Sequence, residues 1–200
     1  MARRGLRGVW VRGELPPGPF VFAANHHSWW DPFLAAVILR SRSTCLIMRQ
    51  ENLARFGLVR RLGVFGTGEH RRGLDYLHEG RVLVIYPEGE LRPAGPLGGL
   101  ADGAAWYARR AGAPLWAVAS RVVMRGHQSA EAYLTGQPVG ATGPDSAVTR
   151  ALAECLGEQL SDMDAAIAAG DPRRPLPGFD LAVPGRRSWD ERIEAMGRRR

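Results

Sequence analysis

The sequence predicts an α/β fold in which a single domain contains a mixed, mostly parallel sheet flanked by helices. Uninterrupted apolar runs at residues 20–24 and 82–86 are typical of strands that are buried on both faces of a parallel sheet. Segments with a helical spacing of apolar residues separate such runs. The chain has 200 residues, 45% of them hydrophobic, which is enough for one domain with a core and too few for two of ordinary size.

Local signals support the elements of the first half in order. An apolar patch at 9–11 lies in a basic, Gly- and Pro-rich stretch and can pair as an edge strand. The strand at 20–24 precedes a helix at 32–40, whose first residue is a proline, as is common at that position. After an apolar strand at 44–48, a helix at 52–61 should direct four apolar residues inward: Leu53, Phe56, Leu58 and Leu62.

The second half continues this alternation. Predicted helices at 73–79 and 101–111 lie on either side of the strand at 82–86. Strands at 115–123 and 131–139 complete the sheet, and the second of them ends in a Gly-Gln-Pro sequence that marks a sheet edge.

A long amphipathic helix and a tail end the chain. Residues 146–168 have apolar residues at helical spacing that should cover one sheet face: Val148, Leu152, Leu156, Leu160, Met163 and Ile167. We therefore assign residues 1–170 to the domain and residues 171–200 to a Pro- and Arg-rich tail, in which 188–196 can form a short capped helix.

Composition narrows the possible partners. The net charge of +7 comes entirely from 27 arginines, because the chain has no lysine, and this excludes lysine Schiff-base chemistry. Arginine grips phosphate in a bidentate manner, so anionic lipid and nucleic acid both fit the charge. We expect no nucleic-acid binding, since the sequence has no module signature and no aromatic residues interleaved with the basic ones.

The sequence also indicates a reduced, cytoplasmic protein without a membrane span. Cys45 and Cys155 have no paired spacing, which fits buried thiols, and the first residues lack the apolar core of a signal peptide. Apolar runs stay far below the ~20 residues that cross a bilayer. A lipid substrate would have to be reached from the membrane surface, through Trp29 and Trp30 or the basic termini.

A polar motif at residues 25–31 lies at the junction between the first buried strand and the following helix. Residues five apart point away from each other on a helix, so His26 and Asp31 can meet only if a turn intervenes. Asp31 precedes a proline and is a natural N-cap, which leaves the chain free to curl and bring the carboxylate to the imidazole. Such a pair makes an oriented general base. The alternative is that the histidines are only turn residues and Asp31 only a cap.

Three motifs in register resemble the glycerolipid (lysophospholipid) acyltransferase family. Asn25-His26, followed by four residues and then Asp31, is similar to its first motif. Residues 86–92 (YPEGELR) look like its Phe-Pro-Glu-Gly-Thr-Arg-Ser block, and residues 112–118 (GAPLWAV) are similar to a further block in which a Pro starts a buried strand. The resemblance runs from about residue 18 to about residue 168 and makes residues 1–170 an acyltransferase domain.

The resemblance implies roles for particular residues. His26 would be the general base, oriented by Asp31, and no metal or cofactor would be needed. The acyl donor would be acyl-CoA or acyl carrier protein, and the acceptor a lipid hydroxyl, first of all that of 1-acylglycerol 3-phosphate. The substrate-binding residues carried over are Asn25, Arg71, Arg72, Glu88, Gly89 and Arg92. The protein would act in the cytoplasm, peripherally attached to the inner face of the cell membrane.

Two departures from the family pattern keep alternatives open. The second motif matches imperfectly, with Glu69 and then His70 or Arg71 where the family has its acid and Arg, and Glu90-Leu91 replaces the family's Thr-Arg. Because Glu90 would repel a phosphate monoester, a glycolipid or glycosylated isoprenoid alcohol is an alternative acceptor. A non-catalytic lipid-binding protein of the same fold is another alternative. A hydrolase with metal ligands at His26, His27, Asp31 and His70 is a third.

Overall fold

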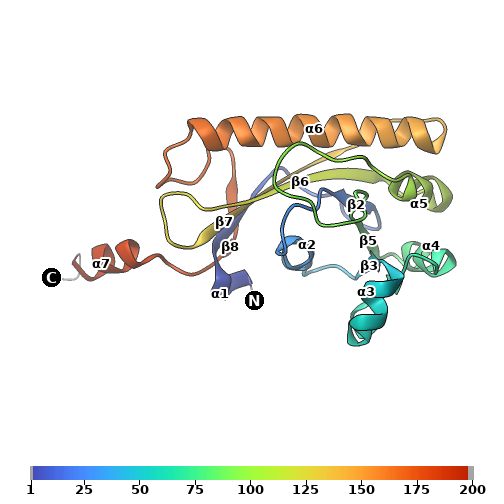
Figure 1. Ribbon diagram of the computed structural model, residues 1–200, viewed down its shortest axis with the longest axis horizontal. Coiled ribbons are helices and arrows are strands. Elements are labelled where there is room, and N and C mark those ends of the chain that lie inside the picture. The colour runs from blue at the N-terminus through green and yellow to red at the C-terminus, as the bar shows by residue number, and fades with distance from the viewer. Residues whose placement is uncertain (1, 198–200) are drawn as a thin grey trace.

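A single sheet of eight strands forms the centre of the molecule, which we describe from a computed structural model covering residues 2–197 (Figure 1). The strands lie in the order β4-β3-β5-β2-β6-β7-β1-β8. Their bounds are β1 Leu6–Arg12, β2 Val21–Ala24, β3 Thr44–Met48, β4 Val64–Gly66, β5 Val82–Ile85, β6 Leu115–Val123, β7 Ala130–Pro138 and β8 Asp180–Pro184.

The pairing confirms the predicted mixed, mostly parallel sheet. Neighbours from β4 to β6 are all parallel, as are β1 and β7, while β6 with β7 and β1 with β8 are antiparallel. The expectation of an edge strand at residues 9–11 is wrong, because β1 lies between β7 and β8. Strand β7 is also interior, but β1 pairs with it only as far as Thr135. Pro138 lies beyond this ladder, so its lack of a backbone N–H leaves no hydrogen bond to β1 unmade.

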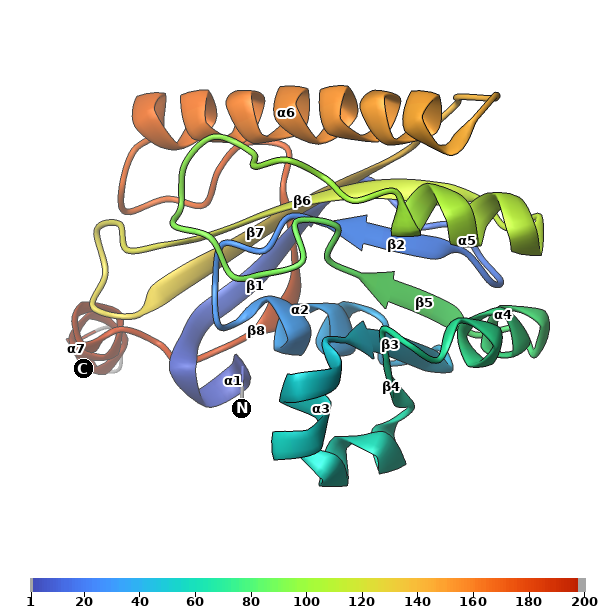
Figure 2. The ribbon, with the colours of Figure 1, turned by 45° about the vertical axis from the view of Figure 1, so that its right-hand side comes forward.

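Helices cover both faces of the sheet. Their bounds are α1 Ala2–Gly5, α2 Asp31–Ile38, α3 Gln50–Arg55, the 3₁₀ helix η1 Gly57–Leu62, α4 His70–His78, α5 Gly103–Ala111, α6 Asp145–Ala169 and α7 Trp189–Gly197. Buried residues of α4, α5 and α6 share one core layer with Ala23 and Leu83, whereas α2 shares the other with Phe22 and Val84. Neighbouring residues of β2 and β5 thus enter opposite layers, which is why these strands are apolar at every position. In Figures 1 and 2, α6 runs along one side of the sheet and α2 lies on the other.

The predicted helix at 52–61 is shorter than expected and most of its predicted inner side is exposed. Helix α3 ends at Arg55, Phe56 leaves the helical region with φ −116° and ψ 41°, and the chain continues as η1. Because the helical phase changes there, only Leu53 is buried, while Phe56, Leu58 and Leu62 are 51%, 77% and 76% exposed. The expectation that these three residues face the core is therefore wrong.

Part of the predicted tail belongs to the sheet. Strand β8 pairs with β1, and Leu176, Phe179 and Val183 are buried. The packed domain thus extends beyond the boundary predicted at residue 170. The apolar residues among the prolines of this segment complete the core next to β1. The predicted short helix at 188–196 is present as α7, and the last three arginines lie outside the described residues. Among the described residues, no helix has the length and apolar character needed to cross a membrane.

Candidate active site

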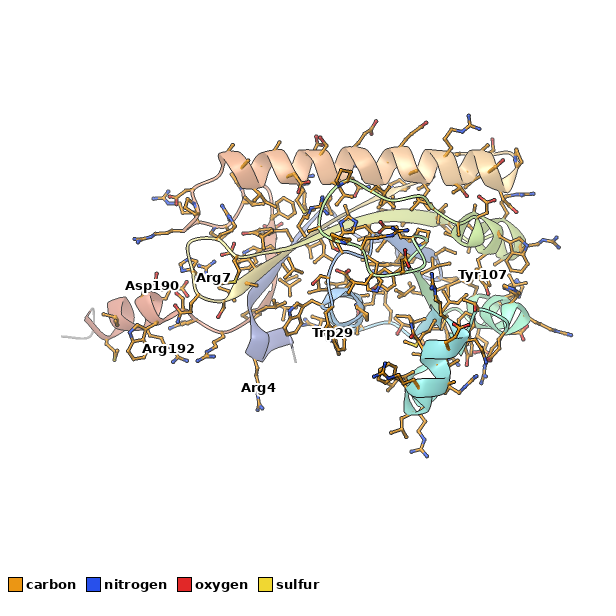
Figure 3. All side chains as sticks on the ribbon, in the orientation of Figure 1. Arg4, Arg7, Trp29, Tyr107, Asp190 and Arg192 are labelled. Carbon is orange, nitrogen blue, oxygen red and sulfur yellow. The ribbon has the colours of Figure 1, made fainter. Side chains whose placement is uncertain are left out.

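The polar motif opens onto a cavity at the carboxyl ends of the parallel strands. Figure 2 shows β2, β3 and β5 pointing to the same side of the molecule, where the loop after β5 passes. Ligand sites of open α/β sheets form at such strand ends. The cavity has a volume of about 630 Å³ and is lined mainly by apolar groups of β3, β5 and α5. Tyr107, labelled in Figure 3, lies in this lining and is itself buried. Polar lining residues include His26, Arg49, Asn52, Thr67, His70, Glu90, Asp102 and Asp145.

His26 and Asp31 meet as the sequence predicts. Nδ1 of His26 lies 3.0 Å from Oδ2 of Asp31, and the carboxyl side chain is only 3% exposed. An ionised carboxylate only accepts, so Nδ1 carries the proton and Nε2 is the ring nitrogen left to exchange a proton with a ligand. The turn that intervenes is closed by the Ser28 N–H, which donates to Asp31 Oδ2 at 2.8 Å.

Asp31 does not cap the helix as expected. Helix α2 begins at Asp31 itself, and Trp30 occupies the N-cap position without a side-chain hydrogen bond. The carboxylate is instead held by its second oxygen, which accepts the Ser120 hydroxyl at 3.0 Å. Its orientation is therefore set by β6 as well as by the turn.

Asn25 supports this arrangement from behind. Its side chain is fully buried, accepts the Ser120 N–H at 2.7 Å and donates to the Ser120 carbonyl at 3.2 Å. Asn25 does not line the cavity, so the structure gives this predicted substrate-binding residue a positioning contact instead. It ties the end of β2 to the residue of β6 that holds Asp31.

The imidazole of His26 is also fixed by its neighbours in space. Tyr86 stacks on it with ring centroids 4.5 Å apart. Burial, with a smaller effect of the Asp31 charge, raises the pKa of Tyr86 well above its usual value, so the phenol stays neutral. The His26 N–H donates to Glu88 at 2.7 Å, and its carbonyl accepts the Arg92 N–H at 2.8 Å.

Glu88 belongs to a buried network and does not line the cavity. Its carboxylate accepts the Gly98 N–H at 3.1 Å and the Nε2–H of His27, 3.3 Å away. Arg121 fixes that His27 tautomer, since its guanidinium, which can only donate, lies 2.6 Å from Nδ1. Asp164 completes the chain with two hydrogen bonds from Arg121 at 2.7 Å, and these bonds lower the pKa of Asp164. Glu88 is therefore buried behind the cavity lining, and its contact with the acceptor stays a prediction.

None of the three arginines predicted to bind substrate lines the cavity, and Arg92 reaches its edge only through its pair with the lining residue Glu90. Arg71 and Arg72 are exposed on α4 outside the cavity lining, and Arg72 pairs with Glu69 at 3.1 Å. Hydrogen bonds from Arg60, foremost, and from Arg72 lower the pKa of Glu69 to about 2.

A different charged group lies at the cavity. Glu90 pairs with Arg92 at 2.7 Å and lies 3.8 Å from Arg49. Arg49 is a lining residue that sequence reasoning missed, although a basic residue directly after the strand at 44–48 is a signal that could have found it. Gly89 also lines the cavity and has a φ of 72°, which favours glycine.

His27 does not join the predicted metal ligands. Its ring faces Glu88 and Arg121, while the imidazole of His26 faces Asp31. Among the residues that the structure describes, no group of three or more His, Cys, Asp or Glu side chains could hold a metal ion. The arrangement is a single oriented imidazole beside a mainly apolar cavity with a charged group, which can accept a proton from a hydroxyl of an amphiphilic ligand.

Comparison with known proteins gives a consistent result. A family description called Acyltransferase matches residues 9–121, which include the polar motif and the loop after β5. The lyso-ornithine lipid O-acyltransferase of Pseudomonas aeruginosa is 37% identical over 90 residues, which cover 40% of this chain and 34% of that protein. The crystal structure of the 1-acyl-sn-glycerophosphate acyltransferase PlsC from Thermotoga maritima is similar with a TM-score of 0.63. At 18% identity, covering 79% of this chain and 73% of that one, this match shows the fold alone.

Proposed function

The chain belongs to the acyltransferase family, and we propose that it moves a fatty acyl group from a thioester to the hydroxyl of a lysolipid, with His26 as the general base. The observation that carries this proposal is the contact between His26 Nδ1 and the buried Asp31 carboxylate at the cavity. The donor would be acyl-CoA or an acylated acyl carrier protein, both of which are cytoplasmic thioesters. The protein would then work at the inner face of the cell membrane as a peripheral enzyme.

The reaction follows from the chemistry of the pair. Nε2 of His26 accepts the proton of the acceptor hydroxyl while its oxygen attacks the thioester carbonyl carbon, so that a C–O bond forms. The tetrahedral intermediate collapses, the C–S bond breaks, and the imidazolium returns its proton to the leaving thiolate. Asp31 stays ionised and stabilises the imidazolium between the two transfers, as in other oriented histidine bases.

The shape and polarity of the cavity support a lipid substrate. Its walls are formed largely by apolar side chains, among them Leu46, Ile47, Met48, Ile85 and Trp106. A fatty chain fills such a space because apolar surface leaves water, at about 0.8 kcal/mol per methylene group. The polar side chains Arg49 and Glu90 leave room for a charged head group.

The head group would contact Arg49, Glu90 and Arg92. Within this cluster, two guanidinium groups around one carboxylate leave a net positive charge, which suits the phosphate of 1-acylglycerol 3-phosphate, while Asp102 and Asp145 also line the cavity. Glu90 favours a second candidate, an amino-acid lipid whose head carries a carboxylate for the arginines and an ammonium for Glu90. The relative described as a lyso-ornithine lipid O-acyltransferase supports this alternative, since ornithine carries both groups.

Product analysis tests the proposal and separates the two acceptors. Purified protein is incubated with palmitoyl-CoA or palmitoyl acyl carrier protein and with each acceptor, and the lipids are identified by mass spectrometry. Acylation of either acceptor that vanishes in His26→Ala supports the proposal, and absence of acylation by folded wild-type protein with every pair contradicts it. Replacement of Glu90 by Gln should lower the rate with lyso-ornithine lipid and raise it with the phosphate acceptor if the ammonium contacts Glu90.

A further inference from the structure

We propose that the segment from Arg49 to Leu62 docks the protein on an anionic membrane, with Phe56, Leu58 and Leu62 entering the lipid and Arg55 and Arg61 contacting the lipid phosphates. We call these five side chains the α3–η1 surface. This inference rests on the proposed function, because a lipid substrate is the reason for the protein to bind a membrane. Membrane binding can nevertheless be measured without enzymatic turnover, so the two proposals can be tested separately.

The first observation is the exposure of the apolar side chains. Leu58 and Leu62 are 77% and 76% exposed, and Phe56 is 51% exposed. All three lie within seven consecutive residues, so exposed large apolar side chains are concentrated in this one segment. Leu53 on the same segment is buried and anchors α3 to the domain. The exposed residues therefore project from a held segment.

The second observation is the charge around them. Residues 49–62 contain four arginines and a single glutamate. Arg60 is held by Glu69 at 2.7 Å, which ties η1 to the residue before α4. Among the described residues, Arg55 and Arg61 pair with no carboxylate, and the guanidinium of Arg55 lies over the Phe56 ring at 5.4 Å. Apolar side chains interleaved with unpaired arginines are typical of segments that lie at an anionic membrane interface.

The third observation is position. Figures 1 and 2 show α3 and η1 projecting from the molecule on the side opposite α6. Arg49 and Asn52, at the start of the same segment, line the cavity, as does Leu91, which is itself 54% exposed. A membrane on this side would lie next to the exposed residues of the cavity lining. A lysolipid could then pass from the membrane into the cavity with little exposure of its acyl chain to water.

An exposed tryptophan lies on the same side of the sheet as the α3–η1 surface. Trp29 is 71% exposed and contacts Phe33 with the two rings tilted and their centroids 5.0 Å apart, whereas Trp30 packs against the α2 core layer. In Figure 3, Trp29 points away from α6, toward the side on which α3 projects. Trp29 is therefore available to a membrane, whereas Trp30 belongs to the core. Tryptophan side chains are enriched in the head-group region of membranes.

A membrane fits better than a protein partner. Three side chains on a narrow projection offer far less than the roughly 800 Å² per partner that a stable protein interface buries. An acidic carrier protein would be recognised by the arginines and would leave the leucines in water. A bilayer takes up projecting apolar side chains without needing a complementary shape.

Vesicle sedimentation tests the inference with three purified variants of the full chain. The apolar variant replaces Phe56, Leu58 and Leu62 by Ser, and the charge variant is Arg55→Gln/Arg61→Gln. The matched control is Met124→Ser/Leu181→Ser, which removes two exposed apolar side chains at other places. Thermal unfolding of each variant shows that it is folded.

With vesicles of three parts phosphatidylcholine and one part phosphatidylglycerol, the apolar variant should bind about tenfold or more weaker than wild type. The charge variant should also bind about tenfold weaker, because each basic residue contributes to attraction by anionic lipid. The control should bind like wild type, and pure phosphatidylcholine should bind the wild type poorly.

Apolar-variant binding within about twofold of wild type would overturn the inference. So would loss of binding in the charge variant alone, which indicates contact with a polyanion such as a carrier protein. A concentration-dependent dimer that the apolar substitutions abolish, seen by sedimentation velocity, would assign the surface to a second copy and also overturn it. Vesicle binding that follows expectation in a protein without acyl transfer would leave docking intact and refute only the proposed function.

Discussion

Substitution of Asp31 by Asn removes one charge while keeping the shape of the site. The amide oxygen can accept the N–H of Ser28 and the Nδ1–H of His26, which Oδ2 of Asp31 accepts now at 2.8 and 3.0 Å. The amide nitrogen then faces the Ser120 hydroxyl, which rotates to accept. What is lost is the attraction between a carboxylate and the imidazolium that forms during the reaction.

The size of the loss follows from Coulomb's law. With charge centres roughly 4 Å apart and an effective dielectric constant of about 20, the attraction is about 4 kcal/mol. Each 1.36 kcal/mol corresponds to a factor of ten in rate, so kcat should fall by about a thousandfold. Loss of the Ser120 hydroxyl removes only one hydrogen bond and leaves the charge. Ser120→Ala should therefore lower kcat by no more than about tenfold, although it destabilises the fold by about 1.5 kcal/mol.

The assay is release of free thiol from palmitoyl-CoA in the presence of the acceptor that wild type uses, followed with a thiol reagent. Circular dichroism and thermal unfolding establish that both variants are folded. If folded Asp31→Asn retained more than about a tenth of the wild-type kcat, the carboxylate charge would not be stabilising the imidazolium, and the reasoning would be refuted.

Three other substitutions or modifications test the supporting structure. Asn25→Ala removes both side-chain hydrogen bonds to Ser120 and should lower the free energy of unfolding by about 2 to 3 kcal/mol in urea titration; no change would contradict this role. Gly89→Ala places a Cβ at a φ of 72° and should lower the free energy of unfolding by about 1 to 2 kcal/mol in the same titration. An unchanged free energy of unfolding would contradict this. Burial raises the pKa of Cys45 to about 12, so its thiol stays protonated at neutral pH and should react with a thiol reagent only in urea; rapid labelling of native protein would contradict this.

The sheet could be predicted from the sequence because its signals are local. Strands β2 and β5 are apolar at every position, and such runs need no knowledge of their partners to be recognised. The course of residues 50–62 could not be predicted in the same way. Apolar spacing around Leu53 is compatible with a longer helix, and the conformation of Phe56 that ends α3 leaves no signal in that spacing.

The same difference explains the site. The approach of His26 to Asp31 depends on a turn of few residues and a proline, so it could be predicted. Glu88 was expected at the acceptor, but its surroundings come from His27, Gly98 and, through His27, Arg121, which are far apart in the chain. Long-range burial of this kind has no periodic signature in the sequence.

The sheet edge shows the effect of long-range pairing again. Leu176 and Val183 lie among prolines and charged residues, a composition typical of an extended tail. They are buried because β8 pairs with β1, a strand that lies more than 160 residues earlier in the chain. The composition of residues 171–185 indicates an extended backbone, but it gives no information on the strand with which β8 pairs.

The central claim is that His26 activates a lipid hydroxyl for acyl transfer. It is tested most directly by thiol release from palmitoyl-CoA with and without a lysolipid acceptor, for wild type and His26→Ala. If His26 is the general base, thiol release depends on the acceptor and is lost in the folded variant. Acceptor-dependent release that persists in His26→Ala at the wild-type rate would contradict it.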